Sequence, residues 1–138
     1  MGERIGDLMT SNPHSVESGS TAMEAARLMR DDDVGIVPVV EAEKLVGTIT
    51  DRDIAIRVVA EGKSPETVTV GEIASRELVT IDPQQDLDEA LRLMARHQVR
   101  RLPVVEEDGR LVGVVAQADV ARRGEDSRTG ELVEEISK

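Results

Sequence analysis

This chain of 138 residues contains no cysteine, phenylalanine, tyrosine or tryptophan. Without cysteine it can form neither disulfides nor thiolate zinc sites, and it has no thiol redox chemistry, which suits a reducing compartment. A chain of this size can bury about two-thirds of its unfolded surface. Aliphatic side chains must fill that core, and a bound heterocycle must lie between aliphatic groups, because no aromatic ring can stack on it.

Positive charge is also scarce, since 17 Lys and Arg residues face 28 Asp and Glu residues, for a net charge of −11. A phosphate backbone is bound mainly by clustered cations, so this balance opposes binding to nucleic acid or to an anionic membrane. No apolar run approaches the roughly 20 residues that span a bilayer, and the start lacks a signal-like stretch. We therefore expect a soluble cytoplasmic protein.

The chain does contain an internal duplication, in which residues 5–57 and 70–123 share one pattern. A constant offset aligns Gly6 with Gly71, and Pro38-Val-Val with Pro103-Val-Val. After a one-residue insertion at Gly109, Asp53 aligns with Asp119. Two copies are too few for a solenoid array. The duplication instead predicts a pseudo-symmetric pair with a cleft where two like surfaces meet.

Each repeat predicts the same order of elements. A small helical lead-in such as 5–9 precedes a short strand near Val16 or Ile81, a helix, two hairpin strands and a second helix. The first helices are marked by capping boxes, Thr21-Ala-Met-Glu24 and Asp86-Leu-Asp-Glu89. Apolar residues at i, i+3, i+4 and i+7 follow each box and predict an inward face: Ala22, Ala25, Ala26 and Met29, then Leu87, Ala90, Leu91 and Met94.

The hairpin strands are predicted at 36–40 with 45–49, and at 102–105 with 111–115, the first of each pair starting at or near its proline. Glu106-Glu-Asp-Gly-Arg110 has the Asp-Gly of a hairpin turn, and residues 41–44 are its shorter counterpart. The second helix of the first repeat begins at Asp51 and ends at Gly62. Its expected apolar face consists of Ile54, Ala55, Val58 and Val59.

The sequence thus predicts a mixed α/β (α+β) fold of two pseudo-symmetric repeats packed through their sheets. We place the first repeat at 5–62, a linker at 63–69, the second repeat at 70–124 and a polar tail at 125–138. The tail has a candidate helix at 131–136 and receives no role.

The most specific segment is Gly47-Thr-Ile-Thr50-Asp-Arg-Asp53, where a buried strand meets a helix. Free N–H groups and the Thr50 hydroxyl suit a phosphate, and the Asp53 carboxylate suits the vicinal hydroxyls of a ribose. The same Thr50-x-x-Asp53 spacing is also an ordinary helix cap that needs no ligand and contributes about 1 kcal/mol. This segment alone does not decide between the two interpretations.

The second repeat helps to separate them, because Ala116-Gln-Ala-Asp119 keeps the aspartate and lacks the threonine. A capping box without its cap has no evident need for Asp119, although acidic residues are common in a first helical turn. The second site also lacks a hydroxyl donor for phosphate.

These residues resemble a tandem pair of CBS domains in the small stand-alone form. The resemblance rests on the segment 47–53, its partner 113–119, and the doubled Pro-Val-Val strands, and it covers roughly residues 5–123. Thr50-Asp-Arg-Asp-Ile54 and His97-Gln-Val-Arg-Arg-Leu-Pro103 further resemble the hypoxic-response type of this family.

The resemblance implies a sensor whose clefts hold an adenosine derivative, such as AMP, ADP, ATP, S-adenosylmethionine or NAD. It implies that Thr50 meets phosphate and that Asp53 and Asp119 hold ribose. It also implies that the cleft is lined by the loop before each Pro-Val-Val strand and by the entry segment near His14. The remaining candidate contacts are therefore Pro13, Val16, Gly35, Ile36 and Pro38, with Arg100 and Arg101 in the second repeat.

Two further clusters have competing interpretations. Arg100 and Arg101 suit phosphate contact, and equally suit ion pairs with the acidic run 31–33. That acidic run could bind Mg²⁺, but three acids at a helix end are usually solvated. His14 and His97 are isolated, so we expect neither zinc nor another metal site.

We expect a non-enzymatic adenosine-ligand sensor, because no nucleophile, metal set or acid pair is evident. No cofactor is required beyond the regulatory ligand. The alternative is a ligand-free interaction or stress-response protein of the same fold. The family resemblance further predicts a homodimer formed through Ala-rich helix faces, and an effector protein that the sequence does not identify.

Overall fold

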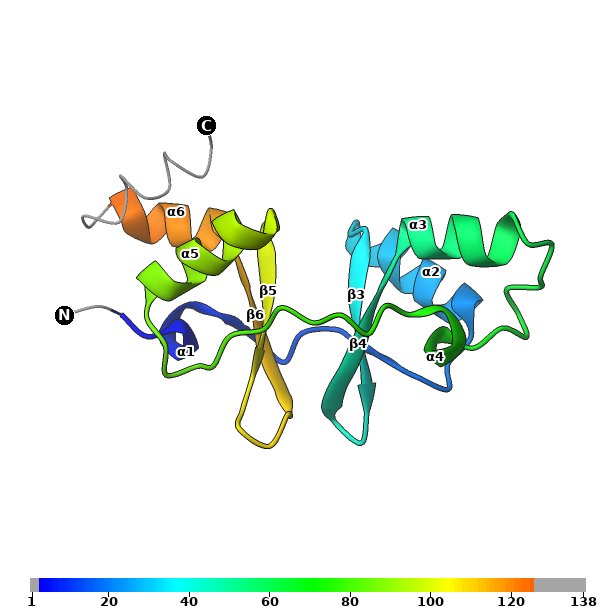
Figure 1. Ribbon diagram of the computed structural model, residues 1–138, viewed down its shortest axis with the longest axis horizontal. Coiled ribbons are helices and arrows are strands. Elements are labelled where there is room, and N and C mark those ends of the chain that lie inside the picture. Colours follow the sequence, from blue (N-terminus) through cyan, green and yellow to red (C-terminus); the bar gives the residue numbers. More distant parts are fainter. Residues whose placement is uncertain (1–2, 126–138) are drawn as a thin grey trace. The chain divides into compact units, whose positions relative to one another are not determined.

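The computed structural model describes residues 3–125 of the chain (Figure 1). It separates into two compact units. Within the described residues, the first-repeat unit comprises residues 14–78, and the second-repeat unit comprises residues 3–13 together with 79–125. The candidate helix at 131–136 lies outside the described residues.

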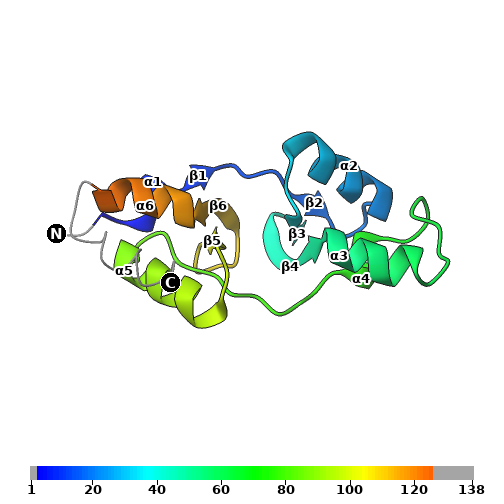
Figure 2. The same cartoon turned by 90° about the horizontal axis from the view of Figure 1, so that it is seen from above.

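The first-repeat unit has a three-stranded sheet of order β2-β3-β4, in which β2 runs parallel and β4 antiparallel to β3. In each unit the helices lie on one face of the sheet (Figures 1 and 2). The elements of this unit are β2 Val16–Glu17, α2 Ala22–Asp32, β3 Ile36–Glu41, β4 Lys44–Thr50, α3 Asp51–Ile54, the π-helical turn η1 Ala55–Val59, and α4 Val70–Ile73.

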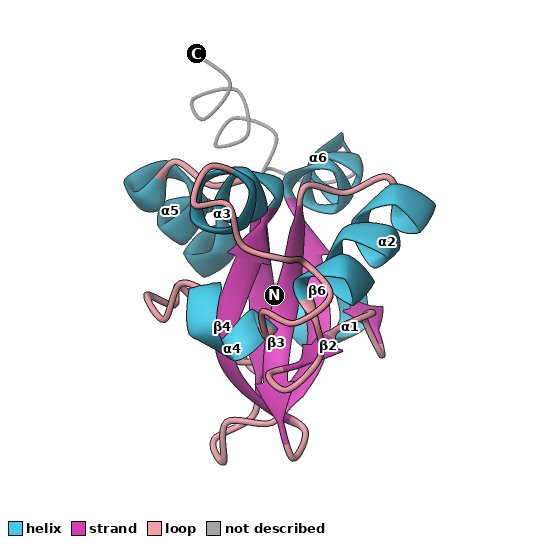
Figure 3. Ribbon diagram, turned by 90° about the vertical axis from the view of Figure 1, so that its right-hand side faces the viewer, coloured by secondary structure: helices cyan, strands magenta, loops and turns pink. Residues whose placement is uncertain are grey.

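The second-repeat unit has an antiparallel sheet of order β1-β6-β5. Its elements are α1 Ile5–Leu8, β1 Thr10–Ser11, α5 Leu87–His97, β5 Arg101–Val105, β6 Leu111–Ala116 and α6 Gln117–Glu125. Ile81, where a strand was predicted, forms a single parallel bridge with Val104. Figure 3 shows this mixture of helices and short strands by colour, and the predicted mixed fold of two alike repeats is confirmed.

The capping residues predicted for the two long helices act as expected. The Thr21 side chain accepts a hydrogen bond from the Glu24 backbone N–H at the start of α2, and Asp86 does the same for Glu89 at the start of α5. Most of each predicted apolar face is buried in its own unit, including Ala22, Ala25 and Met29 in α2 and Leu87, Ala90, Leu91 and Met94 in α5. Ala22, Ala25 and Ala90 therefore pack into the cores of their own units and are not available for a dimer contact, while the homodimer itself stays a prediction.

Each unit contains the lead-in helix of the other repeat. Ile5 of α1 is fully buried in the second-repeat core, and Val70 and Ile73 of α4 are buried in the first-repeat core with Val68. The Val68 carbonyl accepts a hydrogen bond from the Ala22 backbone N–H at 2.9 Å. The repeats of the sequence and the packed units in space therefore have different boundaries.

Helix α4 begins with a capping box in which the Thr69 backbone N–H donates to Glu72 Oε2 at 2.7 Å. This bond, helped by the Thr69 hydroxyl, holds the pKa of Glu72 below its ordinary value of 4.5. The stabilisation is therefore present above pH 4.5 and is lost as the pH falls through the lowered pKa. Because Glu72 is exposed, solvent screening keeps this contribution small.

Strand β3 begins at Ile36, two residues before its proline, although Pro38 cannot donate to a ladder. Pro38 lies opposite Thr48 of β4, and Thr48 directs its backbone N–H to the Ser75 carbonyl at 2.9 Å. Opposed residues of an antiparallel pair either exchange two hydrogen bonds or none, and this pair exchanges none. The missing N–H of Pro38 therefore costs no bond to β4.

The helix after β4 differs from the prediction in its second half. Four α-helical residues pass into η1, where the Ala60 N–H bonds the Ala55 carbonyl at 2.9 Å. Val58 is buried, whereas Ala55 is exposed and Val59 is 69% exposed. The predicted face was therefore half wrong, because the wider π turn directs the two positions 54 and 58 inward and leaves 55 and 59 outside.

Gly47 leaves room for the lead-in of the second repeat (α4 and the residues after it) to pack against strand β4. This lead-in and the α1 lead-in of the first repeat are called the exchanged lead-ins below, because each packs in the unit of the other repeat. A Cβ atom at this position would lie 2.6 Å from the Ser75 carbonyl oxygen. Ser75 follows α4 and pairs with Thr48 through two backbone hydrogen bonds of 2.8 and 2.9 Å. The glycine that begins the segment 47–53 is therefore required for packing.

Gly47→Ala should lower the free energy of unfolding by about 1–3 kcal/mol, because the clash is with backbone that cannot move away cheaply. Gly19→Ala is the control, since a Cβ there meets nothing within 4 Å. The measurement is urea unfolding followed by circular dichroism, as the chain has no fluorescent side chain. Equal stability of Gly47→Ala and the unmodified protein would contradict this account.

Candidate functional site

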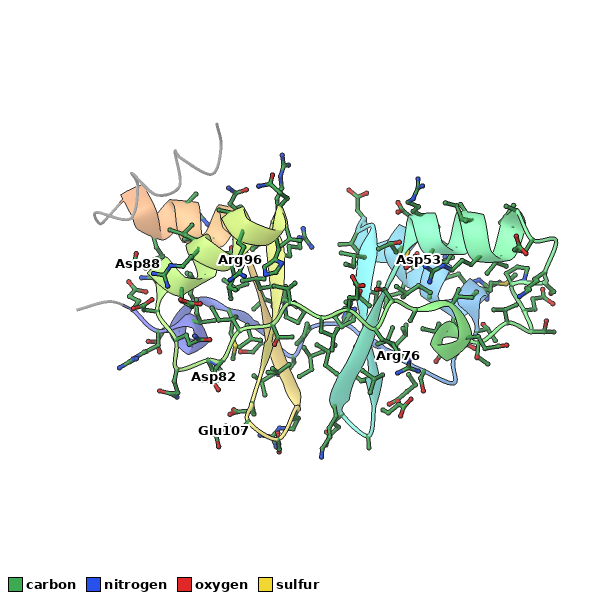
Figure 4. The ribbon with its side chains drawn as sticks, viewed as in Figure 1. Asp53, Arg76, Asp82, Asp88, Arg96 and Glu107 are labelled. Carbon is green, nitrogen blue, oxygen red and sulfur yellow. The ribbon has the colours of Figure 1, made fainter. Side chains whose placement is uncertain are left out.

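The predicted residues of the first repeat meet where β3 begins, β4 ends and α3 starts. Ile36 pairs with Thr50 across the two strands, and the Asp51 backbone N–H donates to the Gly35 carbonyl at 3.0 Å. Asp53 lies one turn into the helix, at the position labelled in Figure 4. Gly35, Ile36, Thr50 and Asp53 therefore share one edge of the unit.

Thr50 and Asp53 form the reciprocal capping box that the sequence allowed. The Asp53 N–H donates to Thr50 Oγ1 at 3.0 Å, and the Thr50 N–H donates to Asp53 Oδ2 at 2.9 Å. These bonds hold the carboxylate in place while its side chain keeps 15% of its surface exposed. The cap leaves the Thr50 hydroxyl hydrogen and the second oxygen of Asp53 available, so capping and ligand binding are compatible here.

Arg57 lies beside this second oxygen, with 3.9 Å between its guanidinium and Asp53 Oδ1. The same guanidinium donates to the Ile73 carbonyl at the end of α4, at 2.7 Å. Arg57 is thus directed mainly at the exchanged lead-in and only weakly at the aspartate. The sequence analysis missed this residue, although its i+4 spacing from Asp53 was the available signal.

The second repeat builds the same junction. Arg101 pairs with Ala116 across β5 and β6, and the Gln117 N–H donates to the Arg100 carbonyl at 2.7 Å. Asp119 accepts from the Ala116 N–H at 3.4 Å, so half of the cap survives without the threonine. The geometry therefore gives Asp119 a capping role that does not depend on a ligand.

Asp119 differs from Asp53 in its second oxygen, which accepts a hydrogen bond from Arg122 one turn along α6. The Asp119 side chain is 19% exposed. Arg122 was also missed from the sequence, although the i+3 spacing indicated such a pair. An open surface hollow lies at this place, lined by Asp7, Leu8, Asp119, Arg122 and Arg123.

The other residues predicted to contact the ligand lie in different environments. Val16 is buried in the first-repeat core, and Pro38 is partly buried within β3. Pro13 belongs to the second-repeat unit, so the structure does not bring it to the first site within one unit. Arg100 and Arg101 are both exposed at the start of β5.

The acidic run 31–33 has partners within its own unit. Asp31 pairs with Arg30 at 2.9 Å, and Asp32 lies 2.5 Å from His14 Nδ1. Within residues 3–125, no group of three or more His, Cys, Asp or Glu side chains is arranged to hold a metal ion. Over the same part of the chain, no helix has the length and apolar character needed to cross a membrane.

A family model described as the CBS domain matches this chain at residues 5–60 and 70–126. Among curated proteins, the CBS domain-containing protein YhcV of Bacillus subtilis is 46% identical over 117 residues, covering 85% of this chain and 82% of that protein. Hypoxic response protein 1 of Mycobacterium tuberculosis is 41% identical over 117 residues, covering 84% of this chain and 81% of that protein.

Solved structures of similar proteins also match the fold of this chain. Hypoxic response protein I with two coordinated zinc ions matches with a TM-score of 0.77 at 40% identity, over 86% of this chain and 97% of that chain. CBSX2 of Arabidopsis thaliana in complex with AMP has a TM-score of 0.76 at 27% identity, over 91% and 98%. The CBS pair of MJ0100 in complex with 5′-methylthioadenosine and S-adenosylmethionine has a TM-score of 0.75 at 28% identity, over 91% and 98%.

The contribution of the two helix caps to stability can be tested without a ligand. Thr50→Val should lower the free energy of unfolding by about 1 kcal/mol, because the Asp53 N–H loses its acceptor. Ala116→Thr should raise it by a similar amount, since a threonine there can accept from the Asp119 N–H as Thr50 does for Asp53. Urea unfolding of both variants tests this. Opposite signs are required, and a destabilising Ala116→Thr would show that the second junction cannot take the cap.

Proposed function

This chain belongs to the CBS domain family, and we propose that it is a non-enzymatic regulatory module that binds an adenosine-containing ligand at the first-repeat junction. The observation that carries the proposal is the state of Asp53. One carboxylate oxygen is fixed by the Thr50 N–H, and the other has no direct hydrogen bond within the described residues. An ionised carboxylate of this kind accepts hydrogen bonds from two vicinal hydroxyls.

Neighbouring groups supply the other contacts of a nucleotide. The Thr50 hydroxyl accepts from the Asp53 N–H and keeps its own hydrogen to donate to a phosphate. Ile36 is 42% exposed beside Thr50 and offers an aliphatic surface to a base. Burial of that exposed surface under a ligand contributes roughly 25 cal/mol per Å² of apolar area. The ligand class follows from the three groups together.

The ligands in the related structures support this choice. AMP in CBSX2, and 5′-methylthioadenosine and S-adenosylmethionine in MJ0100, share an adenosine moiety but differ in phosphate. The ribose hydroxyls are common to all three, and a carboxylate is a suitable acceptor for such a hydroxyl pair. At the second junction Ala116 supplies no hydroxyl, so we propose one principal site per chain.

Regulation follows if the ligand binds one arrangement of the chain better than another, because only a difference in affinity shifts an equilibrium. An effector protein would then respond to the favoured arrangement. The alternative is a ligand-free interaction protein of the same family, in which Thr50 and Asp53 serve only to cap helix α3. The two hypotheses differ in a direct measurement.

Nuclease-treated protein should show an absorbance peak near 260 nm from bound nucleotide, since the chain has no Trp, Tyr or Phe to absorb there. Protein freed of nucleotide should then gain about 2.7 kcal/mol of stability from AMP at 100 times its dissociation constant. Asp53→Ala should remove this gain while the protein remains folded by circular dichroism. Thermal melting with AMP, ATP and S-adenosylmethionine measures it.

The control is Asp86→Ala, which removes the capping carboxylate of α5 and no part of the candidate site. It should cost about 1 kcal/mol of stability and leave the AMP response unchanged. No response of the unmodified protein to any of the three ligands would favour the interaction protein. Unfolding of Asp53→Ala alone would leave the cap as its principal role.

We further propose self-association through the outer face of η1, where Ile56 is 45% and Val59 is 69% exposed. Val59→Arg should shift the protein toward monomer by light scattering after size exclusion, because a buried unpaired charge opposes the contact. Val59→Leu, which keeps the apolar surface, should retain the larger species. Identical masses for both variants would exclude this face.

A further inference from the structure

We propose that Arg122 determines the ligand selectivity of the second repeat by occupying the carboxylate oxygen that would otherwise accept ligand hydroxyls. The inference rests on the proposed function, since it compares the second junction with the first. It names a residue outside the segment 113–119, and it predicts that the two repeats bind unequally for a reason separate from the missing threonine.

The two aspartates use their oxygens differently. Asp53 Oδ2 accepts from the Thr50 N–H, while its Oδ1 is 3.9 Å from the nearest guanidinium nitrogen. Asp119 Oδ2 accepts from the Ala116 N–H at 3.4 Å, and its Oδ1 accepts directly from Arg122 Nη2. Asp119 therefore has both oxygens engaged, one by the last residue of β6 and one by α6, whereas Asp53 has one oxygen engaged.

The position equivalent to Arg122 in the first repeat is Ile56, three residues after Asp53. Ile56 is 45% exposed and has no group that could bond the carboxylate. Its exposed position can accept a longer charged side chain without filling the core. The same i+3 spacing can therefore be created in the first repeat or removed from the second.

The surroundings of Arg122 favour the position seen. Asp119 and Asp7 line the same hollow as Arg122, while the neighbouring Arg123 is drawn to Glu3 at 2.8 Å. A bond between a guanidinium and a carboxylate is charge-assisted and stronger than one from a neutral hydroxyl. A ribose must displace Arg122 before it can be held by Asp119, so the pair weakens binding at this junction.

The effect is moderate, because Arg122 is 77% exposed and solvent screens the pair. An exposed ion pair of this type corresponds to a change in affinity of about two- to fivefold. Adenosine is the appropriate probe, since it has ribose hydroxyls and no phosphate that a guanidinium could attract. AMP then serves as the comparison that reveals phosphate contact.

The first experiment transfers the arginine to the first repeat. Ile56→Arg should weaken adenosine binding about two- to fivefold by calorimetry, because the new side chain can pair with Asp53. Val59→Arg is the control, since it adds the same charge to the same proposed self-association face, and so disturbs that contact equally, at a position six residues from Asp53. Equal weakening by both variants, or unchanged binding by Ile56→Arg, would overturn the proposal.

The second experiment removes the arginine from the second repeat, in Asp53→Ala protein so that the first site does not contribute. Arg122→Ile should strengthen adenosine binding about two- to fivefold. Arg92→Ala is the matched control, since Arg92 forms an i,i+3 pair with Glu89 in the same unit and is 67% exposed. Weaker AMP binding in Arg122→Ile would instead make Arg122 a phosphate ligand and reject the inference.

The outcomes separate this inference from the proposed function. If the unmodified protein binds none of adenosine, AMP, ATP and S-adenosylmethionine, the proposed function fails, and the inference fails with it. If the unmodified protein binds and Asp53→Ala abolishes the stronger site, the proposed function stands. In that case the two arginine experiments decide the role of Arg122 alone.

Discussion

One backbone hydrogen bond, made once in each repeat, sets the geometry of both candidate sites. It runs from the first residue of a helix to the residue before the first hairpin strand, as Asp51 to Gly35 and as Gln117 to Arg100. Because it ties the end of one strand to the approach of the other, the aspartate one turn later is directed to a defined place. The side chains around this bond can then change without altering the junction.

The exchanged lead-ins connect these junctions to the packing of the units. Gly47 leaves room for the segment after α4, and Arg57 bonds the Ile73 carbonyl while lying beside Asp53. The first site is therefore linked by one side chain to a helix that belongs, in sequence, to the other repeat. A ligand that altered Asp53 would act on this contact, which is a physical route for the proposed regulation.

The sequence predicted what local rules determine, and missed what depends on packing. The helix starts at Thr21 and Asp86 follow from capping alone, and the junction at 47–53 follows from its position after a β-branched run. The spacing of Ile54, Ala55, Val58 and Val59 cannot distinguish an α turn from a π turn. The sequence also cannot show which repeat each lead-in packs against, because the two lead-ins have similar apolar patterns.

The two junctions share their backbone geometry but differ in the charge of the residues around them. The neutral residues Gly35, Ile36 and Ile56 of the first repeat correspond to Arg100, Arg101 and Arg122 of the second, in a chain whose net charge is −11. All three arginines are exposed, so they do not disturb the packing of the core. Folding alone does not require these three arginines, because the first junction forms the same backbone bonds with neutral residues at the equivalent positions. The difference bears directly on the proposed sites, because one oxygen of Asp53 has no direct hydrogen bond within the described residues and the equivalent oxygen of Asp119 is bonded by Arg122.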